Sequence, residues 1–442
     1  MRSSVGFVSI SMLCAASLTA QAEALRPVTE ADYAPVNLQE ALLGQQLFYD
    51  PILSGNRTVS CATCHHPDFA TSDGVSLSLG DGGIGLGPER RPDPDNPPEQ
   101  HIPRNAPALF NLGATEFTAL FHDGRIAVDP DRPGGLRTPL DDEMVVGFAN
   151  LLSAQTMFPV LSQDEMAGHY TENEIARAVR QGLITGPDGA WALISDRVAQ
   201  IPAYAEAFTA VYPHITEPDQ IAFTDISNAI AAFVAHEWRS DTSPFDAYLR
   251  GGPALPAEAE AGRVLFYETL GCAGCHAGPF QTDHGFHAMG DVQIGPGKAA
   301  RFESHARDEG RFRVTGHTDD LYAFRTPSLR NIAETAPYGH AGAYAELADY
   351  LRAHADPAAA WAGYGHAAAR VAPLEADTWR VLDDPAERAA ILATVTGPGV
   401  TLSDAEVAAL IAFLEQLTDP VALTGRLGIP AAVPSGLPVV GR

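Results

Sequence analysis

Two short runs of cysteine and histidine are the residues of this sequence best suited to carry chemistry. They are Cys61-Ala62-Thr63-Cys64-His65 and Cys272-Ala273-Gly274-Cys275-His276. In a C-x-x-C-H pattern the two thiols attach covalently to a haem, and the histidine that follows binds its iron. Disulfides and a zinc site are the alternatives, but zinc sites prefer other Cys and His spacings. The pattern predicts two haem c groups, with His65 and His276 as axial ligands.

The other cysteine, Cys14, lies in a segment with the features of a cleavable secretory signal. Arg2 gives a positive start, an apolar stretch follows, and small residues at Ala20 and Ala22 fit a cleavage site. The apolar run falls short of the about 18 residues expected of a membrane span. We therefore expect residues 1–22 to be removed, no membrane span, and a mature protein in the periplasm.

The composition is acidic, with a formal net charge of -27 at pH 7. A nucleic-acid-binding surface needs clustered Lys and Arg, so the sequence predicts no nucleic-acid partner. The hydrophobic content of 45% is ordinary for a globular protein. Such a charge fits a well-solvated exported protein, and it also fits docking to a basic patch on a redox partner.

The segments around the two motifs repeat. The segment that ends in the first motif reads LGQQLFYDPILSGNRTVSCATCH, and the one that ends in the second reads AGRVLFYETLGCAGCH. Each copy therefore has an apolar helix, a short loop and a haem motif. Two copies indicate duplication of a unit rather than a solenoid. We place a domain boundary near Gly251-Gly252, between residues 23–250 and 251–442. The stretch from Gly74 to Gln100, rich in Gly, Pro and Asp, is predicted to be a long loop.

Strand patterns are scarce, whereas helical periodicity is present in TENEIARAVRQGLI, DISNAIAAFVAHEW and LSDAEVAALIAFLEQL. Capping-box patterns are found at Thr171 with Glu174 and at Ser403 with Glu406. The sequence therefore predicts a mainly α fold. The apolar face of the third segment is expected to pack in a core, and it consists of Val407, Leu410, Ile411, Leu414 and Leu417.

Two further motifs accompany the haem motifs: FHDGR lies between them, and FRTPSLRNIAETAPYGHAG follows the second. With these motifs the sequence resembles the bacterial di-haem cytochrome c peroxidase and MauG family over residues 38–420. LSLGDGGIGLGPER and AQTMFPVLSQDEMAG resemble the MauG-like di-haem enzymes linked to methanobactin operons (MbnH-type). The resemblance implies two cytochrome c-like helical domains, each with one covalent haem. The first haem would react with peroxide and the second would transfer electrons.

The resemblance also implies that the first haem has an open face. In the peroxidase branch a second histidine binds this iron, but the matching position here is Asp81. His101 is an alternative that could swing in as a substitute. Family members place a Gln, a Pro and a Glu at the open face, which match Gln155, Pro159 and Glu165. Glu165 would move a proton between the peroxide oxygens, Gln155 would orient peroxide or water, and Pro159 would shape the pocket.

The second haem departs from the family pattern. The histidine of the TAPY-x-H motif, here His340, bonds a haem propionate in the family. The second axial ligand is Met in the peroxidases and Tyr in MauG, and the matching residue here is His354. The resemblance therefore implies a haem bound by His276 and His354, with Tyr350 and Met289 as alternatives. A bis-His haem has a lower potential than a His/Met haem, because imidazole favours ferric iron.

The motif FHDGR has a histidine, His122, where the family usually has a tryptophan that relays electrons between the haems. Imidazole could take over the relay or could simply hydrogen-bond a propionate, and both interpretations stay open. Arg125 of the same motif is expected to pair with a propionate, because a guanidinium matches a carboxylate with two parallel hydrogen bonds.

A calcium ion between the domains is a further family feature. Its side-chain ligand would be Asn105 in RNAPALFN, and carbonyl oxygens would come from Thr335 and Pro337. Hard oxygen ligands with added waters suit calcium. The alternative is that Asn105 only caps a turn.

Three functions stay open on the sequence. The first is a MauG-like enzyme that uses hydrogen peroxide to oxidise a residue on a periplasmic partner, which in the resembling subgroup means tryptophan to kynurenine on a copper-binding protein. The second is a cytochrome c peroxidase that reduces hydrogen peroxide with electrons from a small redox protein. The third is a non-catalytic electron-transfer cytochrome. Asp81 in place of His, and His354 in place of Met, favour the first.

Overall fold

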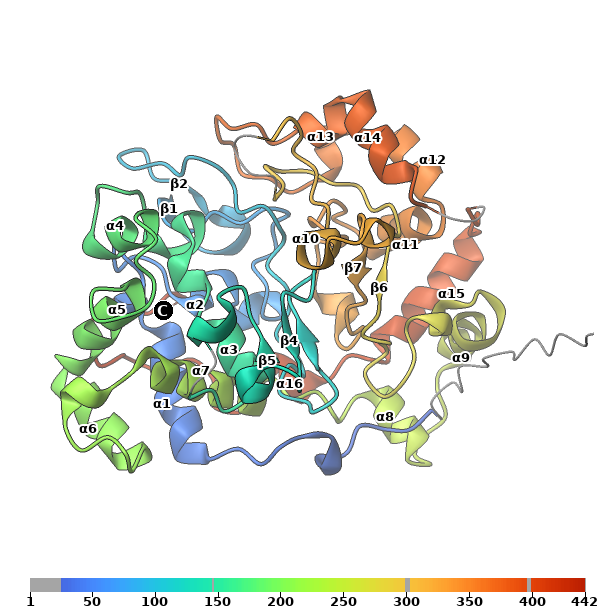
Figure 1. The fold of residues 1–442 in the computed structure, drawn as a ribbon. Helices are drawn as coiled ribbons and strands as arrows, with labels where there is room; N and C mark the ends of the chain where they lie inside the picture. The colour runs from blue at the N-terminus through green and yellow to red at the C-terminus, as the bar shows by residue number, and fades with distance from the viewer. Residues whose placement is uncertain (1–24, 145–146, 299–302, 396–398, 442) are drawn as a thin grey trace, which may run out of the picture.

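The computed structural model describes residues 25–441 except 145–146, 299–302 and 396–398 (Figure 1). The predicted signal segment, residues 1–22, lies outside this part of the chain. Helices dominate, which confirms the mainly α prediction. None of the described helices combines enough length and hydropathy to span a bilayer.

The regular elements are as follows. The helices are α1 (Leu38–Tyr49), α2 (Cys61–Cys64), α3 (Leu151–Thr156), α4 (Glu174–Arg180), α5 (Ala190–Ala199), α6 (Pro202–Val211), α7 (Phe223–Glu237), α8 (Pro244–Leu249), α9 (Ala257–Val264), α10 (Phe312–Thr315), α11 (Leu347–Ala355), α12 (Pro357–Gly363), α13 (Arg380–Asp383), α14 (Pro385–Leu392), α15 (Asp404–Glu415) and α16 (Pro420–Thr424). The strands are β1 (Gly83–Ile84), β2 (Arg91–Pro92), β3 (Ala119–Leu120), β4 (Ile126–Val128), β5 (Leu136–Arg137), β6 (Phe286–His287) and β7 (Phe324–Arg325). The strands pair antiparallel as β1-β2, β3-β4-β5 and β6-β7.

The N-terminal half is built on a close crossing of α1 with α7. A Cβ on Gly44 of α1 would lie 1.8 Å from the carbonyl oxygen of Ala229, so the two backbones can approach this closely only at a glycine. Phe48, Phe233 and Trp238 fill the core beside the crossing, with ring centroids 5.1–5.2 Å apart. Each buried ring of this size stabilises the fold by about 1.5–3 kcal/mol. This core supports α2, which carries the first haem motif.

The C-terminal half repeats the same crossing with α9 and α15. A Cβ on Gly262 would lie 1.8 Å from the carbonyl oxygen of Ala409. Phe266, on the π-helical turn Leu265–Thr269 that continues α9, packs on Phe413 of α15, with ring centroids 5.3 Å apart. The glycine and the phenylalanine occupy matching places in LGQQLFY and AGRVLFY, so the structure confirms the duplication.

Two predicted helix starts can be compared with the structure. α15 begins after Ser403, whose hydroxyl and N–H both donate to the Glu406 carboxylate, so this capping box is confirmed. The capping box of Thr171 with Glu174 is wrong, because α4 begins at Glu174 and Asn173 is its N-cap. An asparagine directly before the helix satisfies the first free N–H groups as well as a threonine does.

A third apolar cluster joins the predicted long loop to the C-terminal half. It contains Trp361 of α12, Val381 of α13 and Leu77 of the loop. Leu77 also forms a β-bridge with Val371. The first part of the loop is therefore buried between the two halves.

Two segments cross the boundary that we place near Gly251-Gly252. α8 precedes the boundary, yet its Phe245 is buried in the C-terminal core. The tail after α16 returns to the N-terminal half, where Val433 and Val439 are buried in the core. The C-terminus lies close to α2 in Figure 1, and Gly441 is packed against His66. Each half is thus completed by residues from the other side of the boundary.

Candidate functional site

The first C-x-x-C-H motif forms α2 and the turn that follows it. His65 stands at the C-terminal end of α2. Its Nδ1 donates to the carbonyl oxygen of Thr71 over 3.0 Å, so the lone pair of Nε2 remains for a metal. Burial lowers the pKa of His65, which keeps the imidazole in the neutral form that binds iron. These features fit a proximal haem ligand.

The second motif has the same arrangement. Cys272–Gly274 form a short 3-10 turn, and Nδ1 of His276 donates to the carbonyl oxygen of Gln281 over 3.0 Å. Burial, followed by the nearby imidazole of His354, lowers the pKa of His276 to about 4. Thr71 and Gln281 both have a positive φ, at 63° and 50°. The same unusual turn therefore orients the proximal ring in both copies.

His354 of α11 lies opposite His276, with ring centroids 6.4 Å apart. Two imidazoles that each place a nitrogen about 2 Å from one metal hold their centroids about 6 Å apart. Nδ1 of His354 lies 3.9 Å from Oδ1 of Asp291 and 3.4 Å from the hydroxyl of Tyr350. A carboxylate on this side of an imidazole orients its other nitrogen towards a metal. The pair His276 and His354 fits a haem held on both faces.

The two alternative ligands are placed differently. The hydroxyl of Tyr350 donates to Oδ2 of Asp291 over 3.3 Å, so it lies on the Nδ1 side of His354. Met289 is in the segment after β6, and 37% of it is exposed. Among the three candidates, His354 is the residue whose ring pairs with that of His276.

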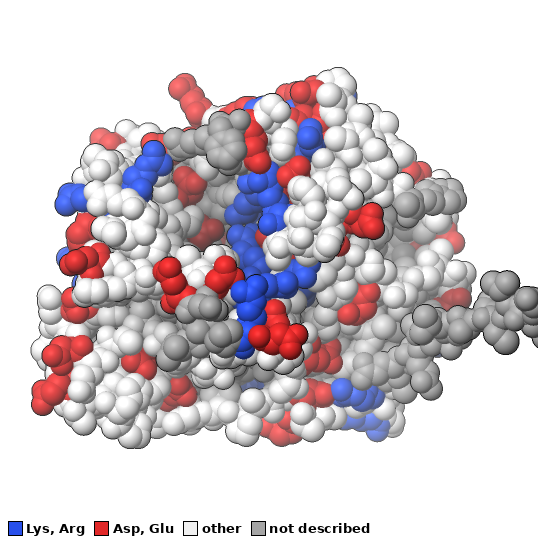
Figure 2. Space-filling model, viewed as in Figure 1, with Lys and Arg blue, Asp and Glu red and all other residues white. Residues whose placement is uncertain are grey.

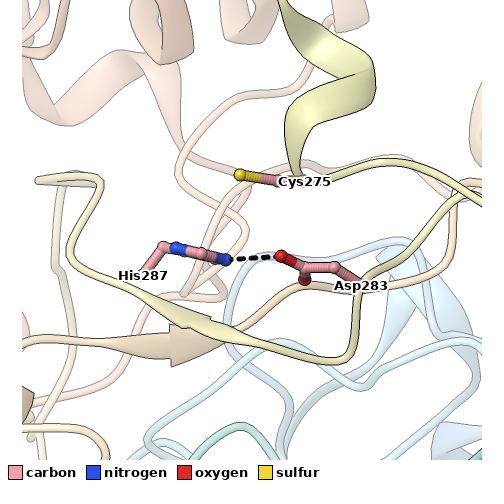
Figure 3. Close-up of side chains that lie close together, drawn as sticks. All are labelled: Cys275, Asp283 and His287. Atoms are coloured by element: carbon pink, nitrogen blue, oxygen red, sulfur yellow. Dashed lines mark hydrogen bonds and ion pairs between the residues drawn. The ribbon is translucent and has the colours of Figure 1, made fainter. Parts of the chain in front are cut away.

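A group of three polar side chains surrounds Cys275 of the second motif. Figure 3 shows that Asp283 and His287 point towards each other beside the Cys275 sulfur. Nε2 of His287 lies 2.8 Å from Oδ2 of Asp283, and the polar atoms of all three residues lie within 4.8 Å of one another. Such a triad could bind a metal only through a thiolate, and a cysteine bonded to haem has none. The pair Asp283 and His287 is therefore part of the haem surroundings.

Two of the predicted catalytic residues lie on neighbouring turns. Gln155 is at the end of α3, and Pro159 begins the 3-10 turn Pro159–Leu161. Oε1 of Gln155 is buried and has no hydrogen-bond partner among the described residues. Buried polar atoms almost always have a partner, so this oxygen is suited to a bound ligand.

The third predicted catalytic residue, Glu165, lies on the π-helical turn Gln163–Ala167. Burial raises the pKa of Glu165, and the nearby charges of Lys298 and Arg125 oppose that rise. Its own negative charge adds to the burial that raises the pKa of the Cys64 thiol, so the carboxylate lies near the first haem motif. A carboxyl group with a raised pKa beside a haem can both accept and donate a proton.

The position of the family's second histidine is occupied by a buried carboxylate. Oδ1 and Oδ2 of Asp81 accept hydrogen bonds from Thr58 and Asn56 over 2.9 and 2.8 Å. His101 uses both of its nitrogens elsewhere: Nε2 lies 2.9 Å from the carbonyl oxygen of Ala372 and Nδ1 lies 3.2 Å from the Thr378 hydroxyl. Asp81 has no side-chain nitrogen, and both ring nitrogens of His101 already have partners, so in this arrangement neither residue offers the first haem an imidazole ligand.

A buried polar cluster lies where the two halves meet. Oδ2 of Asp308 lies 3.0 Å from Nε2 of His122 and 3.3 Å from Nε2 of His340. Arg104 contacts Nδ1 of His340. Burial lowers the pKa of His122 to about 3. Burial alone would raise the pKa of Asp308, but the two imidazoles hold it well below its usual value. One buried anion therefore links a histidine of each half.

Positively charged side chains gather at this junction. Figure 2 shows Lys and Arg along a hollow between the two halves. Arg125 has a protein partner, since its Nη2 lies 2.9 Å from Oδ2 of Asp123. Arg104 and Arg325 are partly buried and form no ion pair with a described carboxylate, and burial lowers the pKa of each to about 10. Guanidinium groups of this kind suit haem propionates.

Two of the predicted calcium ligands, Asn105 and Pro337, both lie near Gly342. Nδ2 of Asn105 donates to the carbonyl oxygen of Val75 over 2.7 Å, which leaves Oδ1 for another partner. The Asn105 amide and the Pro337 ring each lie 3.1 Å from the place that a Cβ of Gly342 would occupy. Thr335 precedes Pro337 on the same turn. The arrangement is compatible with an oxygen-ligated cation.

Two carboxylates of the site were not predicted from the sequence, Asp291 and Asp308. Neither belongs to a recognisable motif, and each approaches its histidine only through tertiary folding. An indirect signal for such partners is present in the sequence. It has 15 histidines, of which only two belong to haem motifs. Any other histidine that is buried needs a polar partner, so carboxylates beside some of them could be expected.

Comparison with known proteins identifies a family of di-haem enzymes. The family model for di-haem cytochrome c peroxidase matches residues 38–254. Cytochrome c551 peroxidase of Pseudomonas aeruginosa is 31% identical over 323 residues, which cover 73% of each chain. MauG of Paracoccus denitrificans is 28% identical over 398 residues, which cover 86% of this chain and 88% of that protein.

Two solved structures of di-haem proteins have a similar fold. A MauG-like protein associated with microbial copper homeostasis superposes with a TM-score of 0.59 and 26% identity, covering 90% of this chain and 94% of that one. The di-haem peroxidase BthA of Burkholderia thailandensis gives a TM-score of 0.56 at 22% identity, over 91% of this chain and 90% of that one, and so supports the fold.

The duplicated haem motifs, the two cytochrome c-like halves and these relatives lead to one assignment. Membership of the family implies two haem c groups, and its named relatives are peroxidases and MauG proteins, not passive electron carriers. The chain belongs to the di-haem cytochrome c peroxidase and MauG family of haem-dependent oxidoreductases.

Proposed function

We propose that this protein is a periplasmic enzyme that uses hydrogen peroxide to oxidise a residue on a partner protein by long-range electron transfer. The difference between the two proximal histidines carries the proposal. His354 faces His276, whereas no histidine or tyrosine ring of the described residues pairs with His65. One haem would thus be held on both faces and the other on one face.

An open haem, when bound, supplies an iron that takes peroxide and accepts two oxidising equivalents from it. Side chains of this protein transfer the proton that the reaction requires. Glu165 takes the proton from one peroxide oxygen and delivers it to the other, which then leaves as water. The unpartnered Oε1 of Gln155 accepts a hydrogen bond from the peroxide and holds it in place. Pro159 shapes the pocket without adding an N–H donor.

Reduction of one hydrogen peroxide to two waters consumes two electrons and two protons. The electrons pass the junction of the halves, where the ring of His122 lies 5.8 Å from those of Phe324 and His340. Oδ2 of Asp308 lies within 3.3 Å of Nε2 of both imidazoles. His122 therefore stands where an electron relay is needed, held by a buried anion.

The electrons come from a residue on a docked periplasmic protein, and a tryptophan of a copper-binding protein, with kynurenine as product, is the candidate. This conversion removes four electrons from the tryptophan, adds oxygen from water and releases one carbon as formate, so it consumes two molecules of hydrogen peroxide. The similarity to a MauG-like protein associated with microbial copper homeostasis supports this choice. A second haem with His354 in place of methionine also supports it, since its lower potential disfavours uptake of electrons from a high-potential cytochrome.

The second candidate function is reduction of hydrogen peroxide with electrons from a small redox protein. The 31% identity to cytochrome c551 peroxidase favours it. The two functions differ in where the electrons originate, and that difference can be measured directly.

The test combines the holoprotein, hydrogen peroxide and a candidate copper-binding partner. Mass spectrometry of the partner is expected to show an oxidised tryptophan, and Glu165→Gln is expected to remove it. Stopped-flow assays with reduced cytochrome c provide the comparison. Fast turnover of the cytochrome with an unmodified partner would establish the second function instead.

Three further features belong to the proposal. A calcium ion would be bound by Asn105 and by the carbonyl oxygens of Thr335 and Pro337, since hard oxygen ligands suit this ion. Residues 23–250 and 251–442 would form the two haem domains. The periplasmic location rests on the signal features of residues 1–22.

A further inference from the structure

Four tyrosines gather beside His354. Tyr350 lies one turn before it on α11, with ring centroids 5.4 Å apart. The rings of Tyr338 and Tyr344 lie 6.3 and 5.9 Å from that of Tyr350. Tyr364 lies 5.2 Å beyond Tyr344. The cluster thus begins in contact with the second ligand of the bis-His site and extends away from it.

The hydroxyl groups of these tyrosines have different partners. That of Tyr350 donates to the Asp291 carboxylate over 3.3 Å. Those of Tyr338 and Tyr364 donate to backbone carbonyl oxygens over 3.2 and 2.6 Å. That of Tyr344 is buried and has no hydrogen-bond partner among the described residues. A carboxylate can keep a proton, whereas a peptide carbonyl cannot, so Tyr350 alone of the four is paired with a base.

This pairing matters because a phenol that loses an electron becomes a strong acid. It gives up the electron readily only where a base takes the proton at the same time. We infer that Tyr350 is a one-electron donor to the haem held by His276 and His354, with Asp291 as the acceptor of the phenolic proton. The inference rests on the proposed function, which supplies hydrogen peroxide as the oxidant.

The step is balanced as follows. One electron leaves the Tyr350 ring for the haem pair that hydrogen peroxide has oxidised. The O–H bond of Tyr350 breaks and the proton moves to Oδ2 of Asp291, which leaves a neutral phenoxyl radical and a carboxylic acid. An electron from the partner protein reverses the step, and the proton returns. Tyr350 therefore holds one oxidising equivalent while no partner is docked.

The neighbouring rings explain why the equivalent stays there. Tyr344 is close enough to exchange an electron with Tyr350, but its buried hydroxyl has no base to receive a proton. Oxidation of Tyr344 would leave a buried charge, which is costly. Tyr344 and Tyr364 are therefore matched controls, since they belong to the same cluster but lack the carboxylate.

The experiment uses the holoprotein, one equivalent of hydrogen peroxide and no partner, frozen rapidly for electron paramagnetic resonance. We expect a radical signal that narrows when the protein is made with ring-deuterated tyrosine. Tyr350→Phe should abolish the signal, whereas Tyr344→Phe and Tyr364→Phe should retain it. The resting optical spectrum of Tyr350→Phe should match the unaltered protein, which shows that His354 is still in place.

Asp291→Asn tests the proton acceptor. The amide oxygen of asparagine still accepts a hydrogen bond from Nδ1 of His354, so the second haem should keep both imidazole ligands, but an amide takes up no proton. We therefore expect loss of the tyrosine signal with Tyr350 still present. A signal that survives in Tyr350→Phe, that does not respond to the tyrosine label, or that persists in Asp291→Asn overturns the inference.

The same samples separate this inference from the proposed function. An optical change with peroxide but no tyrosine signal overturns the inference alone. A tyrosine signal without oxidation of any partner overturns the proposed function alone. No optical change with peroxide overturns both.

Discussion

At the scale of single residues, two carboxylates lie against the histidines of the site. Asp291 lies on the Nδ1 side of His354, and Asp308 lies between His122 and His340. Imidazole has two nitrogens, and the partner of one fixes the orientation and proton of the other. The Asp291 contact would thereby direct His354 to the iron of the second haem, whereas the Asp308 contacts keep His122 and His340 at the junction of the halves.

The first prediction concerns the second axial ligand. His354→Met replaces an imidazole with a thioether, which stabilises ferrous iron, so the potential of the second haem should rise. An increase on the order of 0.1 V lies well within the ~0.8 V over which axial ligands set haem potentials. Spectroelectrochemical titration measures it, with Met289→Leu as the control. An unchanged potential in His354→Met and a shifted one in Met289→Leu would identify Met289 as the ligand.

The second prediction concerns Glu165 and pH. Because burial raises the pKa of Glu165, the carboxyl group is protonated below that value and cannot accept the peroxide proton. The rate of reaction with peroxide should rise with pH through this raised pKa and then level off. Glu165→Gln should remove the step and slow the reaction by about 10²–10⁴-fold. Stopped-flow spectroscopy measures both, and Asp164→Asn on the same turn should keep the step.

The haem attachment residues were predictable because covalent chemistry imposes a fixed local spacing on Cys61, Cys64 and His65. The role of His354 stays a prediction from its position within a motif, since no local pattern marks a second axial ligand; the structure shows that its ring lies opposite that of His276. The partners of these residues were not predictable: Asp291 and Asp308 reach the site through long-range packing, which leaves no periodic signal in the sequence.

At the scale of elements, the two helix crossings set the geometry of the haem motifs. α1 with α7 and α9 with α15 each approach so closely that a glycine is required at the contact. The helix periodicity of α7 and α15 was visible in the sequence, whereas the crossings were not. A glycine within a helix normally indicates a weak point, and only the structure shows that Gly44 and Gly262 are packing contacts.

The third prediction follows from this contact. Gly44→Ala should destabilise the protein by about 1–3 kcal/mol, because the new Cβ would collide with the Ala229 carbonyl oxygen. Gly363→Ala, at the end of α12 where a Cβ meets nothing within 4 Å, should leave stability unchanged or improve it slightly. Thermal unfolding followed by haem absorbance measures both. Equal effects of the two substitutions would contradict the steric explanation.

At the scale of the whole molecule, the two halves are tied together by exchanged segments. α8 packs in the C-terminal core, and the tail packs in the N-terminal core. The hydroxyl of Ser435 in the tail donates to Oδ1 of Asp50 over 2.6 Å. The halves share the polar cluster of His122, Asp308 and His340 as well. Relative movement of the halves is therefore restrained at several separate places.

The fourth prediction concerns the tail. Deletion of residues 430–442 exposes the sites that bury Val433 and Val439, so the N-terminal half should lose roughly 3 kcal/mol or more of stability. Hydrogen exchange is expected to speed up in α1 and α7 but not in α9 and α15. Uniform acceleration in all four helices would show that the tail stabilises the molecule generally.

The return of the tail to the first half also constrains the order of maturation. Domains of exported chains usually close in the order in which they emerge, from the amino end onwards. Here the core of the N-terminal half includes Val433 and Val439, which are among the last residues to be synthesised. The core that supports the haem motif at Cys61 and Cys64 can therefore be completed only when nearly the whole chain is present, by which point the second haem motif is present as well.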